Sequence, residues 1–232
     1  MDWFKRKDKQ YFSYDHDIHS HILPGLDDGV KRVEDSVVIV KKMLELGVKQ
    51  FSFTPHISFP SPMNTPEIIL EKLNELKKCL LKEKIEIEAD AGAEYKIGEY
   101  MIDLIRQGNI ASFHGGKVLV EHSFVAPSPV FEEVIFRLQD KGYTPVLAHP
   151  ERYPFYMKHL TERVWELKRR GCRIQVNLLS FVGFYGKEAM AGARELLVAR
   201  LIDYFSGDIH SVKQAELLEK FLKSKESEKL LV

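Results

Sequence analysis

The feature that most restricts the fold of this chain is a repeated alternation of short apolar runs with longer segments of helical period. We expect seven strands, near residues 14–19, 49–54, 86–92, 117–122, 144–148, 173–178 and 202–206. Amphipathic segments separate and follow them, near residues 33–46, 66–83, 98–107, 129–141, 160–170, 187–200 and 212–223. Strands that alternate with helices are joined by right-handed crossovers, so the pattern predicts an α/β fold with a parallel sheet.

Seven such units fit either an open, doubly wound sheet or a closed barrel, and the alternation alone favours neither. An open sheet gathers its chemistry at one switch point and usually supplies a glycine-rich phosphate loop, which this sequence lacks. Here polar residues follow almost every expected strand, as they do at the carboxyl-terminal face of a barrel. We therefore expect a TIM-like barrel with its site at the C-terminal ends of the strands.

The composition is that of an ordinary globular protein of 232 residues, with 44% hydrophobic and 29% charged residues. Lys+Arg and Asp+Glu both number 34, so no overall field favours nucleic acid. The exception is a short basic run at the start, made of Lys5, Arg6, Lys7 and Lys9. We expect residues 1–13 to form a solvated basic arm and residues 14–232 to form a single domain.

Two further features favour a cytoplasmic location. No apolar stretch approaches the roughly 18 residues of a membrane span, and the start of the chain lacks a signal-peptide core. The two cysteines, Cys79 and Cys172, are far apart in sequence, which suits a reducing compartment better than a disulfide framework. We therefore expect a cytoplasmic protein with no membrane span and no nucleic-acid partner.

Ionisable residues stand at the ends of six of the seven expected strands. In chain order they are His19 and His21 followed by Asp27 and Asp28, then His56, Glu94, Glu121 beside His122, His149 followed by Arg152, and Asp208 with His210. Each has an ordinary structural explanation when taken alone, such as a turn at Asp27-Asp28-Gly29. Because the carboxyl ends of parallel strands meet at one face, residues that recur there are expected to converge on one site.

The residue types at these strand ends are those that bind metal ions. Imidazoles and carboxylates without thiolates suit Mn²⁺, Fe²⁺ or Zn²⁺. Five histidines with four carboxylates make nine groups, which at about three to four protein ligands per ion fit two or three metals. A multinuclear site at a barrel mouth predicts hydrolysis of a phosphate ester, in which the ions lower the pKa of a water and hold the phosphoryl oxygens.

Six short motifs follow one another along the chain: His-x-His, Thr-Pro-His, Gly-Ala-Glu, the glutamate after the fourth strand, Ala-His-Pro-Glu-Arg and Asp-x-His. In this order they resemble the PHP (polymerase and histidinol phosphatase) superfamily. Residues 19–29 and 147–153 are more similar still to bacterial metal-dependent protein-tyrosine phosphatases encoded with capsule and exopolysaccharide machinery. The resemblance covers roughly residues 15–215.

The resemblance implies a distorted seven-stranded barrel of the PHP type and a trinuclear centre that usually contains manganese. One ion would be bound by His19, His21, Glu94 and Asp208, a second by Glu94, Glu121 and His149, and a third by Asp28, His56 and His210. Asp28 matches the motif better than Asp27, with a slip of one residue left open. Glu121 matches the phosphatase branch, whereas some PHP members have a histidine, and His122 should face the opposite way.

The resemblance also implies how phosphate is bound. Arg152 matches the phosphate-binding arginine of the family, and a guanidinium can donate hydrogen bonds to two phosphoryl oxygens at once. With Arg152, we expect His149 and Asp208 to be the catalytic residues. The arginine that the family has shortly after the last motif is absent, and Lys213 is the nearest cation. The other histidines match no motif and are expected to be structural or exposed: His16, His114 and His159.

These residues together imply a phosphotyrosine-protein phosphatase that works by metal-activated hydroxide. Its partner would be the phosphorylated tail of a bacterial tyrosine kinase that controls polysaccharide export. A cysteine-based mechanism is not expected, because the sixth residue after Cys79 is Ile85 and the sixth after Cys172 is Leu178, so neither forms Cys-x5-Arg. Aromatic residues near the motif ends could flank a phenolic ring, although packing is the simpler expectation for most of them: Tyr95, Tyr153, Phe155, Tyr156, Phe184 and Tyr185.

Two alternatives to this function stay open. The same metal chemistry would serve a small phosphomonoester such as histidinol phosphate. A non-catalytic adaptor, stabilised by metal and binding the kinase tail, would also retain the ligand residues.

Overall fold

The computed structural model describes residues 14–230, so the expected basic arm at residues 1–13 lies outside the described residues. The strands are β1 (His16–Asp17), β2 (Gln50–Phe53), β3 (His56–Ile57), β4 (Glu88–Ala91), β5 (Glu94–Lys96), β6 (Lys117–Glu121), β7 (Thr144–Ala148), β8 (Arg173–Asn177) and β9 (Tyr204–Ser206). The α-helices are α1 (Val33–Glu45), α2 (Pro66–Lys82), α3 (Glu99–Gln107), α4 (Phe131–Asp140), α5 (Leu160–Arg169), α6 (Lys187–Val198), α7 (Val212–Leu222) and α8 (Lys225–Leu230). Short 3-10 helices are η1 (Pro150–Arg152), η2 (Met157–His159) and η3 (Leu178–Val182).

Each segment that the sequence pattern predicts as a helix or strand is found as one. The first strand is shorter than expected, because β1 ends at Asp17, before His19 and His21. Two short strands, β3 and β5, were not expected, and each follows a predicted strand after a break of two residues.

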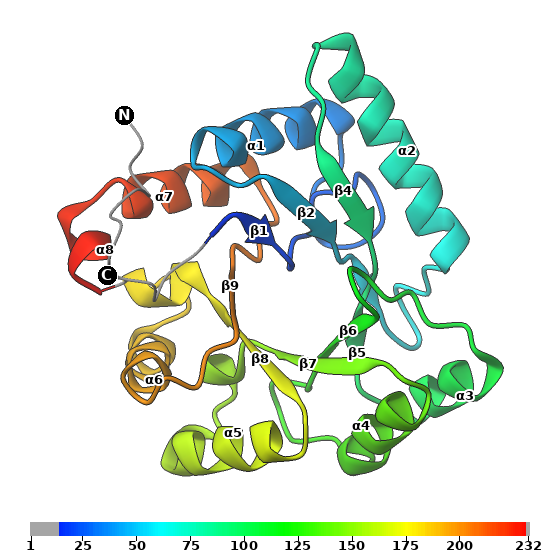
Figure 1. The fold of residues 1–232 in the computed structure, drawn as a ribbon, viewed down its shortest axis with the longest axis vertical. Coiled ribbons are helices and arrows are strands. Elements are labelled where there is room, and N and C mark those ends of the chain that lie inside the picture. Colours follow the sequence, from blue (N-terminus) through cyan, green and yellow to red (C-terminus); the bar gives the residue numbers. More distant parts are fainter. Residues whose placement is uncertain (1–13, 231–232) are drawn as a thin grey trace.

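All strand pairs are parallel, and the helices lie outside the strands, as Figure 1 shows. The expected α/β class with parallel strands is therefore confirmed. The strands form two sheets, in the orders β1-β2-β4 and β3-β5-β6-β7-β8-β9. The expected single closed barrel of seven strands is not confirmed. Between the ends of the two sheets the structure has an isolated parallel bridge, which joins Ser20, after β1, to Ile209, after β9.

The division into two sheets comes from two neighbouring interruptions. Residues 54–55 separate β2 from β3, and residues 92–93 separate β4 from β5. Pro55 has no N–H to donate to a strand ladder, so pairing breaks at this point. Beyond the break the N–H of Glu94 donates to the carbonyl of Pro55 at 3.0 Å, and His56 and Glu94 become register partners of β3 and β5. Two candidate ligands are thereby placed side by side.

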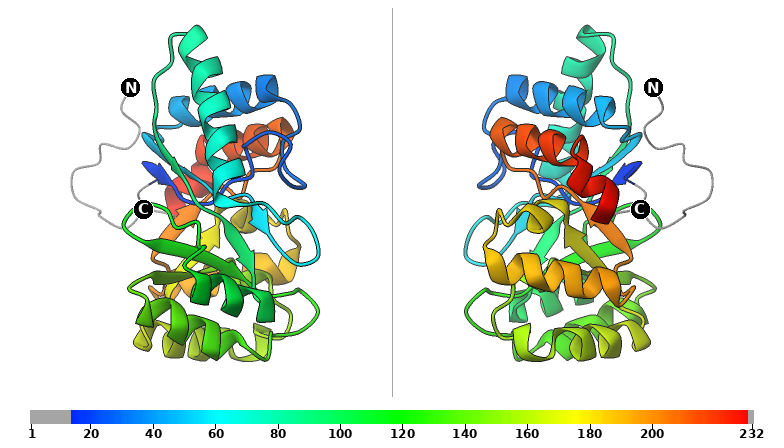
Figure 2. Two further views of the ribbon diagram at one scale, coloured as in Figure 1. Left: turned by 90° about the vertical axis from the view of Figure 1, so that its right-hand side faces the viewer. Right: turned by 90° about the vertical axis from the view of Figure 1, so that its left-hand side faces the viewer.

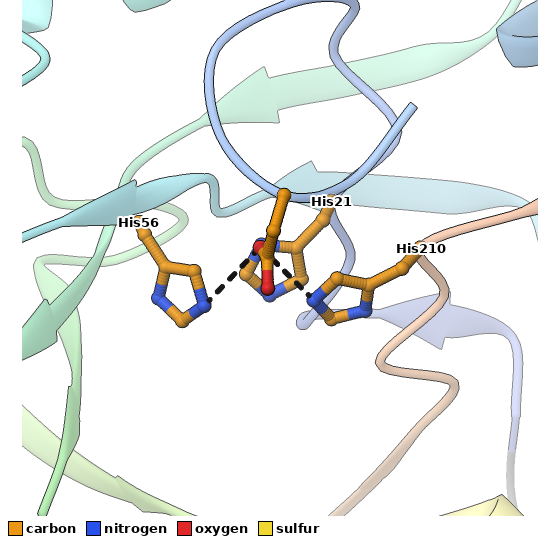
Figure 3. A group of neighbouring side chains, drawn as sticks. His21, His56 and His210 are labelled. Carbon is orange, nitrogen blue, oxygen red and sulfur yellow. Dashed lines mark ion pairs between the residues drawn. The ribbon is translucent and has the colours of Figure 1, made fainter. Parts of the chain in front are cut away.

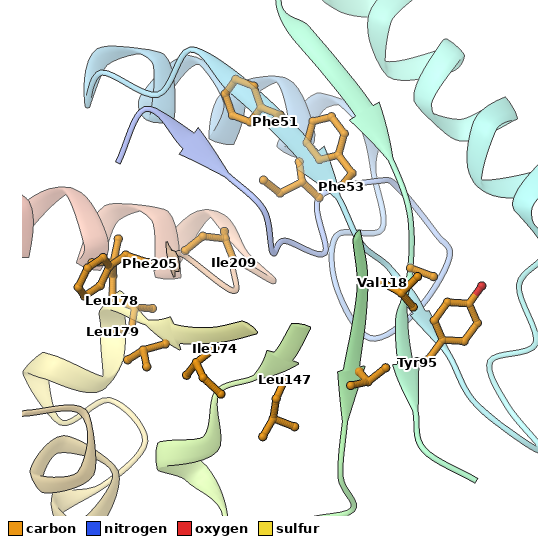
Figure 4. Close-up of a cluster of buried hydrophobic side chains, with 14 of the residues drawn as sticks. Phe51, Phe53, Tyr95, Val118, Leu147, Ile174, Leu178, Leu179, Phe205 and Ile209 are labelled. Carbon is orange, nitrogen blue, oxygen red and sulfur yellow. The ribbon is translucent and has the colours of Figure 1, made fainter. Parts of the chain in front are cut away.

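The apolar core has two parts. A large cluster lies between the strands and the helices, and Figure 4 shows part of it around Leu147 and Ile174. A small second cluster includes Val146 and Ala148, which flank Leu147 along β7. Successive strand residues point to opposite faces, so β7 contributes to both clusters. On β8 the face that does not carry Ile174 holds the buried polar residue Gln175.

The loops that follow the strands define the face where the candidate site lies. In Figure 2 the loops after β3 and β6 project from the same side of the molecule. At the start of α7 the Ser211 hydroxyl accepts a hydrogen bond from the N–H of Gln214 at 3.3 Å, and this N-cap fixes the chain directly after His210. Across residues 14–230 no helix is both long enough and apolar enough to cross a membrane.

Candidate metal centre

All nine predicted ligands lie in one region, and each belongs to at least one group of ligand atoms that lie within 4.8 Å of one another. His56 is in β3, Glu94 is in β5 and Glu121 ends β6. The others stand in the loops that follow strands: His19, His21 and Asp28 after β1, His149 after β7, and Asp208 and His210 after β9. The structure therefore brings together residues that span most of the chain.

Four ligand atoms pack closely at the buried centre of this region. His19 Nε2 lies 3.2 Å from His21 Nε2, 3.1 Å from Glu94 Oε2 and 3.3 Å from Asp208 Oδ1. His21 Nε2 lies 3.3 Å from the same Glu94 oxygen and 3.4 Å from the same Asp208 oxygen. Both imidazole nitrogens thus lie within 3.4 Å of one oxygen of Glu94 and one oxygen of Asp208, a spacing compatible with bonds of about 2 Å to a shared divalent transition metal. The donor set therefore fits a metal ion.

A second group lies nearer the surface and is shown in Figure 3, where the rings of His21, His56 and His210 face a shared carboxylate. Asp28 Oδ1 lies 3.6 Å from His56 Nε2 and 3.5 Å from His210 Nε2. The Asp28 side chain is 70% exposed, so this group opens to solvent. Of the two neighbouring aspartates, Asp28 is thus the one whose carboxylate lies beside Nε2 of both His56 and His210.

Glu94 and Glu121 connect the groups. Glu94 Oε1 lies 3.0 Å from His149 Nε2, while Glu94 Oε2 lies 3.2 Å from His56 Nδ1. Glu121 Oε1 lies 3.5 Å from His56 Nδ1. The next residue, His122, points the other way, and its Nε2 lies 3.0 Å from the hydroxyl of Tyr156. The expectation that Glu121 and His122 face opposite sides holds in the structure.

Two of the candidate ligands have backbone conformations that side-chain-bearing residues rarely adopt. The φ angles of His149 and Asp208 are 35° and 51°. His149 also precedes Pro150, a position that normally favours extended backbone. Such left-handed conformations cost on the order of 1 kcal/mol or more and persist where surrounding contacts determine them. At both residues the chain turns sharply at the end of a strand and directs a side chain into the site.

A chain of amide side chains on β8 orients the buried ligands. His19 Nδ1 lies 2.9 Å from Gln175 Oε1, Gln175 Nε2 donates to Asn177 Oδ1 at 2.8 Å, and Asn177 Nδ2 donates to Asp208 Oδ2 at 2.6 Å. Because Gln175 Oε1 can only accept, Nδ1 of His19 carries the proton that it donates, which leaves Nε2 to face the other ligands. The backbone N–H of His149 also donates to the backbone carbonyl of Gln175, at 2.8 Å.

The sequence analysis missed Gln175 and Asn177, because it searched strand ends for histidines and carboxylates. Their signal was the alternation Ile174-Gln175-Val176-Asn177, in which polar residues occupy one face of a strand whose other face is apolar. Uncharged amides on one face of a buried strand need partners, and such a pattern indicates a polar interior.

Asp27 positions the second histidine of the His-x-His motif. Its Oδ2 accepts a hydrogen bond from His21 Nδ1 at 2.7 Å, and it also accepts from the N–H of His56 at 2.8 Å. The loop closes tightly at Gly29, where a Cβ atom would lie 2.1 Å from the carbonyl oxygen of His21. A side chain at this position would displace the loop, so the Asp-Asp-Gly sequence serves the site and is more than a surface turn.

Electrostatics keep protons on the central histidines in the absence of a cation. Burial by itself would lower the pKa of His19, but the charges of Glu94 and Asp208 outweigh it and raise that pKa to about 9. The pKa of His21 is raised in the same way, with Asp27 as the largest favourable charge. Conversely, burial and the neighbouring Glu94 charge raise the pKa of Glu121, against the opposing positive charge of Lys96. A divalent cation would take the place of these protons.

Arg152 lies at the edge of the buried group. Its Nη1 donates to Asp208 Oδ2 at 2.8 Å, and the Tyr185 hydroxyl donates to the same oxygen at 3.2 Å. The guanidinium lies 4.0 Å from the ring centroid of Tyr185 and 4.7 Å from that of Phe124. These contacts hold a cation beside the ligands in a fixed orientation.

The remaining predicted residues lie apart from these groups. Lys213 is exposed in the first turn of α7, and no ion pair joins it to a ligand among residues 14–230. His16 bonds to Ser52 at 2.9 Å, and its ring lies 5.4 Å from that of His114. The exposed His159 pairs with Glu162. Both cysteines are free thiols.

Comparison with known proteins places the chain in a family. A family model described as "Capsular polysaccharide synthesis, CpsB/CapC" matches residues 15–222. The tyrosine-protein phosphatase YwqE of Bacillus subtilis is 33% identical over 204 residues, which cover 85% of this chain and 78% of YwqE. This chain belongs to the CpsB/CapC family, and the resemblance predicted from its ordered motifs is confirmed.

Solved structures agree with this assignment. One reported for YwqE from Bacillus subtilis and CpsB from Streptococcus pneumoniae, "unique metal-dependent tyrosine phosphatases", has a TM-score of 0.79 at 30% identity, covering 93% of this chain and 90% of that chain. A phosphotriesterase homology protein from Escherichia coli has a TM-score of 0.56 at 12% identity, covering 94% of this chain and 92% of that chain, and shares the fold alone.

The amide chain on β8 leads to a first prediction. Gln175→Leu removes both the acceptor for His19 Nδ1 and the donor to Asn177, so we expect metal affinity to fall by about 10- to 100-fold. Competition with a chromogenic chelator measures this affinity directly. The matched control is Gln107→Leu, since Gln107 is exposed at the end of α3. Equal affinities in the two variants would contradict the role of Gln175.

The raised pKa of His19 gives a second prediction. Because that pKa is about 9, the ring is protonated at pH 7.5 in the metal-free protein, and metal binding must expel the proton. We expect at least about one proton to be released per chain at pH 7.5, falling as the pH rises through 9. Calorimetry in two buffers of different ionisation enthalpy measures the release. No release at pH 7.5 would contradict the prediction.

Proposed function

We propose that this chain is a metal-dependent protein-tyrosine phosphatase, a hydrolase that converts phosphotyrosine and water into tyrosine and inorganic phosphate. One observation carries the proposal: nine imidazole and carboxylate side chains converge at the ends of parallel strands, with Arg152 fixed against one of them. The names of the relatives support it, since YwqE is a tyrosine-protein phosphatase.

We assign three ions to this centre, most simply Mn²⁺, with Fe²⁺ or Zn²⁺ as chemically suitable substitutes. The first would be held by His19, His21, Glu94 and Asp208, the second by Glu94, Glu121 and His149, and the third by Asp28, His56 and His210. The distances given above support the first and third sets, and in the second set His149 Nε2 lies 3.0 Å from Glu94 Oε1 and 4.0 Å from Glu121 Oε2. When bound, such ions lower the pKa of water and offset the charge of a phosphoryl group.

The side chains of the protein supply binding and orientation. Arg152 presents its guanidinium to the phosphoryl oxygens while Asp208 and the Tyr185 hydroxyl keep it in place. Phe124 is 43% exposed beside this guanidinium and offers an apolar surface to the tyrosyl ring of a substrate. His149 and Asp208, each turned into the site by a left-handed backbone, serve as catalytic ligands.

The proposed substrate is a tyrosine-phosphorylated protein in the cytoplasm, namely the phosphorylated tail of a bacterial tyrosine kinase that regulates capsule or exopolysaccharide synthesis. The family description, which refers to capsular polysaccharide synthesis, supports this setting. The 70% exposure of the Asp28 side chain also supports it, because the group around Asp28 is accessible to a residue carried by another protein.

The test compares substrates on the metal-loaded chain. We expect kcat/KM for a phosphotyrosyl peptide to exceed that for histidinol phosphate by at least about 100-fold, which corresponds to about 2.7 kcal/mol of transition-state binding. His149→Ala should lower peptide turnover by about 1000-fold or more with an unchanged unfolding temperature. The control His159→Ala removes an exposed histidine outside the site and should be without effect.

Other outcomes separate the alternatives. Faster turnover of histidinol phosphate would identify a small-molecule phosphatase. Tight binding of the peptide with no phosphate release from the fully loaded protein would identify an adaptor and contradict an enzymatic role. Full activity of His149→Ala would refute the proposed site.

A further inference from the structure

A pocket of about 470 Å³ adjoins the candidate metal centre on the side of Glu121. Its lining includes Asp28, His56 and Glu121 from the ligand groups. Among the residues that the structure describes, the lining contains one lysine, Lys96, and no arginine. Arg152, which contacts Asp208, is not part of this lining. The two cations therefore stand at different edges of the centre.

The strand geometry directs Lys96 toward this pocket. Lys96 ends β5 and is two residues beyond Glu94, so both side chains leave the strand on the same face. Its register partner on β6 is Glu121. The Lys96 carbonyl accepts a hydrogen bond from the Tyr100 hydroxyl at 2.6 Å, and the next N–H, of Ile97, donates to the carbonyl of Glu121 at 2.9 Å. The backbone that carries Lys96 is thus fixed on both sides.

The ammonium group of Lys96 is available to a ligand. The side chain is exposed, and no ion pair engages it in the part of the chain that the structure describes. Its charge acts on the buried Glu121 carboxylate, so it lies within electrostatic range of the ligand groups. A lysine without an ion-pair partner beside a cluster of metal ligands is placed to bind an anion that the metals also attract.

We propose that Lys96 is a second phosphoryl-binding cation, which approaches the substrate from the Glu121 side while Arg152 approaches from the Asp208 side. This inference rests on the proposed phosphatase function and names a binding residue that the sequence analysis missed. A tyrosyl phosphate carries up to two negative charges on three free oxygens, more than one guanidinium can satisfy. The flexible stem of lysine suits a group that must follow the phosphoryl oxygens as they move during the reaction.

The experiment measures binding of inorganic phosphate to the metal-loaded full chain by calorimetry, alongside kcat and KM for a phosphotyrosyl peptide. We expect Lys96→Met to weaken phosphate binding by about 10-fold and to raise KM, while metal content stays unchanged. Lys96→Arg keeps the charge and should stay within about 3-fold of the unmodified chain. The control Lys82→Met, at the exposed end of α2, should bind phosphate normally.

Three results would overturn the proposal. Phosphate binding by Lys96→Met could equal that of Lys82→Met. Lys96→Met could lose metal, in which case the lysine only balances the charge of Glu121. Lys213→Met could weaken phosphate binding as much as Lys96→Met, which would favour the cation predicted from sequence. Absence of peptide hydrolysis in the unmodified chain would refute the phosphatase function instead, and the phosphate titration would still test Lys96.

Discussion

The close packing of four ligand atoms from His19, His21, Glu94 and Asp208 is the interaction on which the rest of this structure depends. The two imidazole nitrogens lie 3.2 Å apart in a buried position, and each lies 3.1–3.4 Å from one oxygen of Glu94 and one oxygen of Asp208. Such a set is unstable without a positive charge at its middle, because like charges and lone pairs would face one another in a medium of low dielectric. The raised pKa of His19 shows that a proton meets this need when no metal is bound.

The fold brings these atoms together by several local departures from regular structure. Pairing breaks at Pro55 and resumes with His56 and Glu94 in register. The chain turns through left-handed conformations at His149 and Asp208, and the loop after His21 closes at Gly29. The left-handed backbone at His149 and Asp208 is locally unfavourable, and each of these departures places or supports a candidate ligand. Contacts in the two apolar clusters and the hydrogen bonds of the amide chain on β8 offset that local cost.

Much of this architecture follows from the sequence by simple rules. Apolar runs and helical periods locate every predicted strand and helix, because burial of one face dominates the stability of each element. The nine candidate ligands are recognisable since histidines and carboxylates recur after parallel strands, and the structure brings all of them together. Only the structure distinguishes the roles of the two aspartates. The carboxylate of Asp28 lies beside the His56 ring, whereas that of Asp27 accepts a hydrogen bond from His21.

Other features could not be predicted because they depend on contacts between distant segments. The division into two sheets reflects pairing that resumes beyond Pro55, which no local pattern indicates. Gln175 and Asn177 look like ordinary strand residues until His19 and Asp208 are placed beside them. Lys96 is one of many exposed lysines in the sequence, and only its register with Glu121 and its place in the pocket distinguish it from Lys213.

The central claim is that the converging side chains form a metal centre on which phosphatase activity depends. Elemental analysis of the purified full chain, joined to activity assays after chelation and after re-addition of single metals, tests it most directly. The account predicts about three divalent ions per chain, loss of phosphotyrosine hydrolysis on chelation, and recovery in proportion to the metal restored. Full hydrolysis by protein shown to contain no bound metal would contradict it.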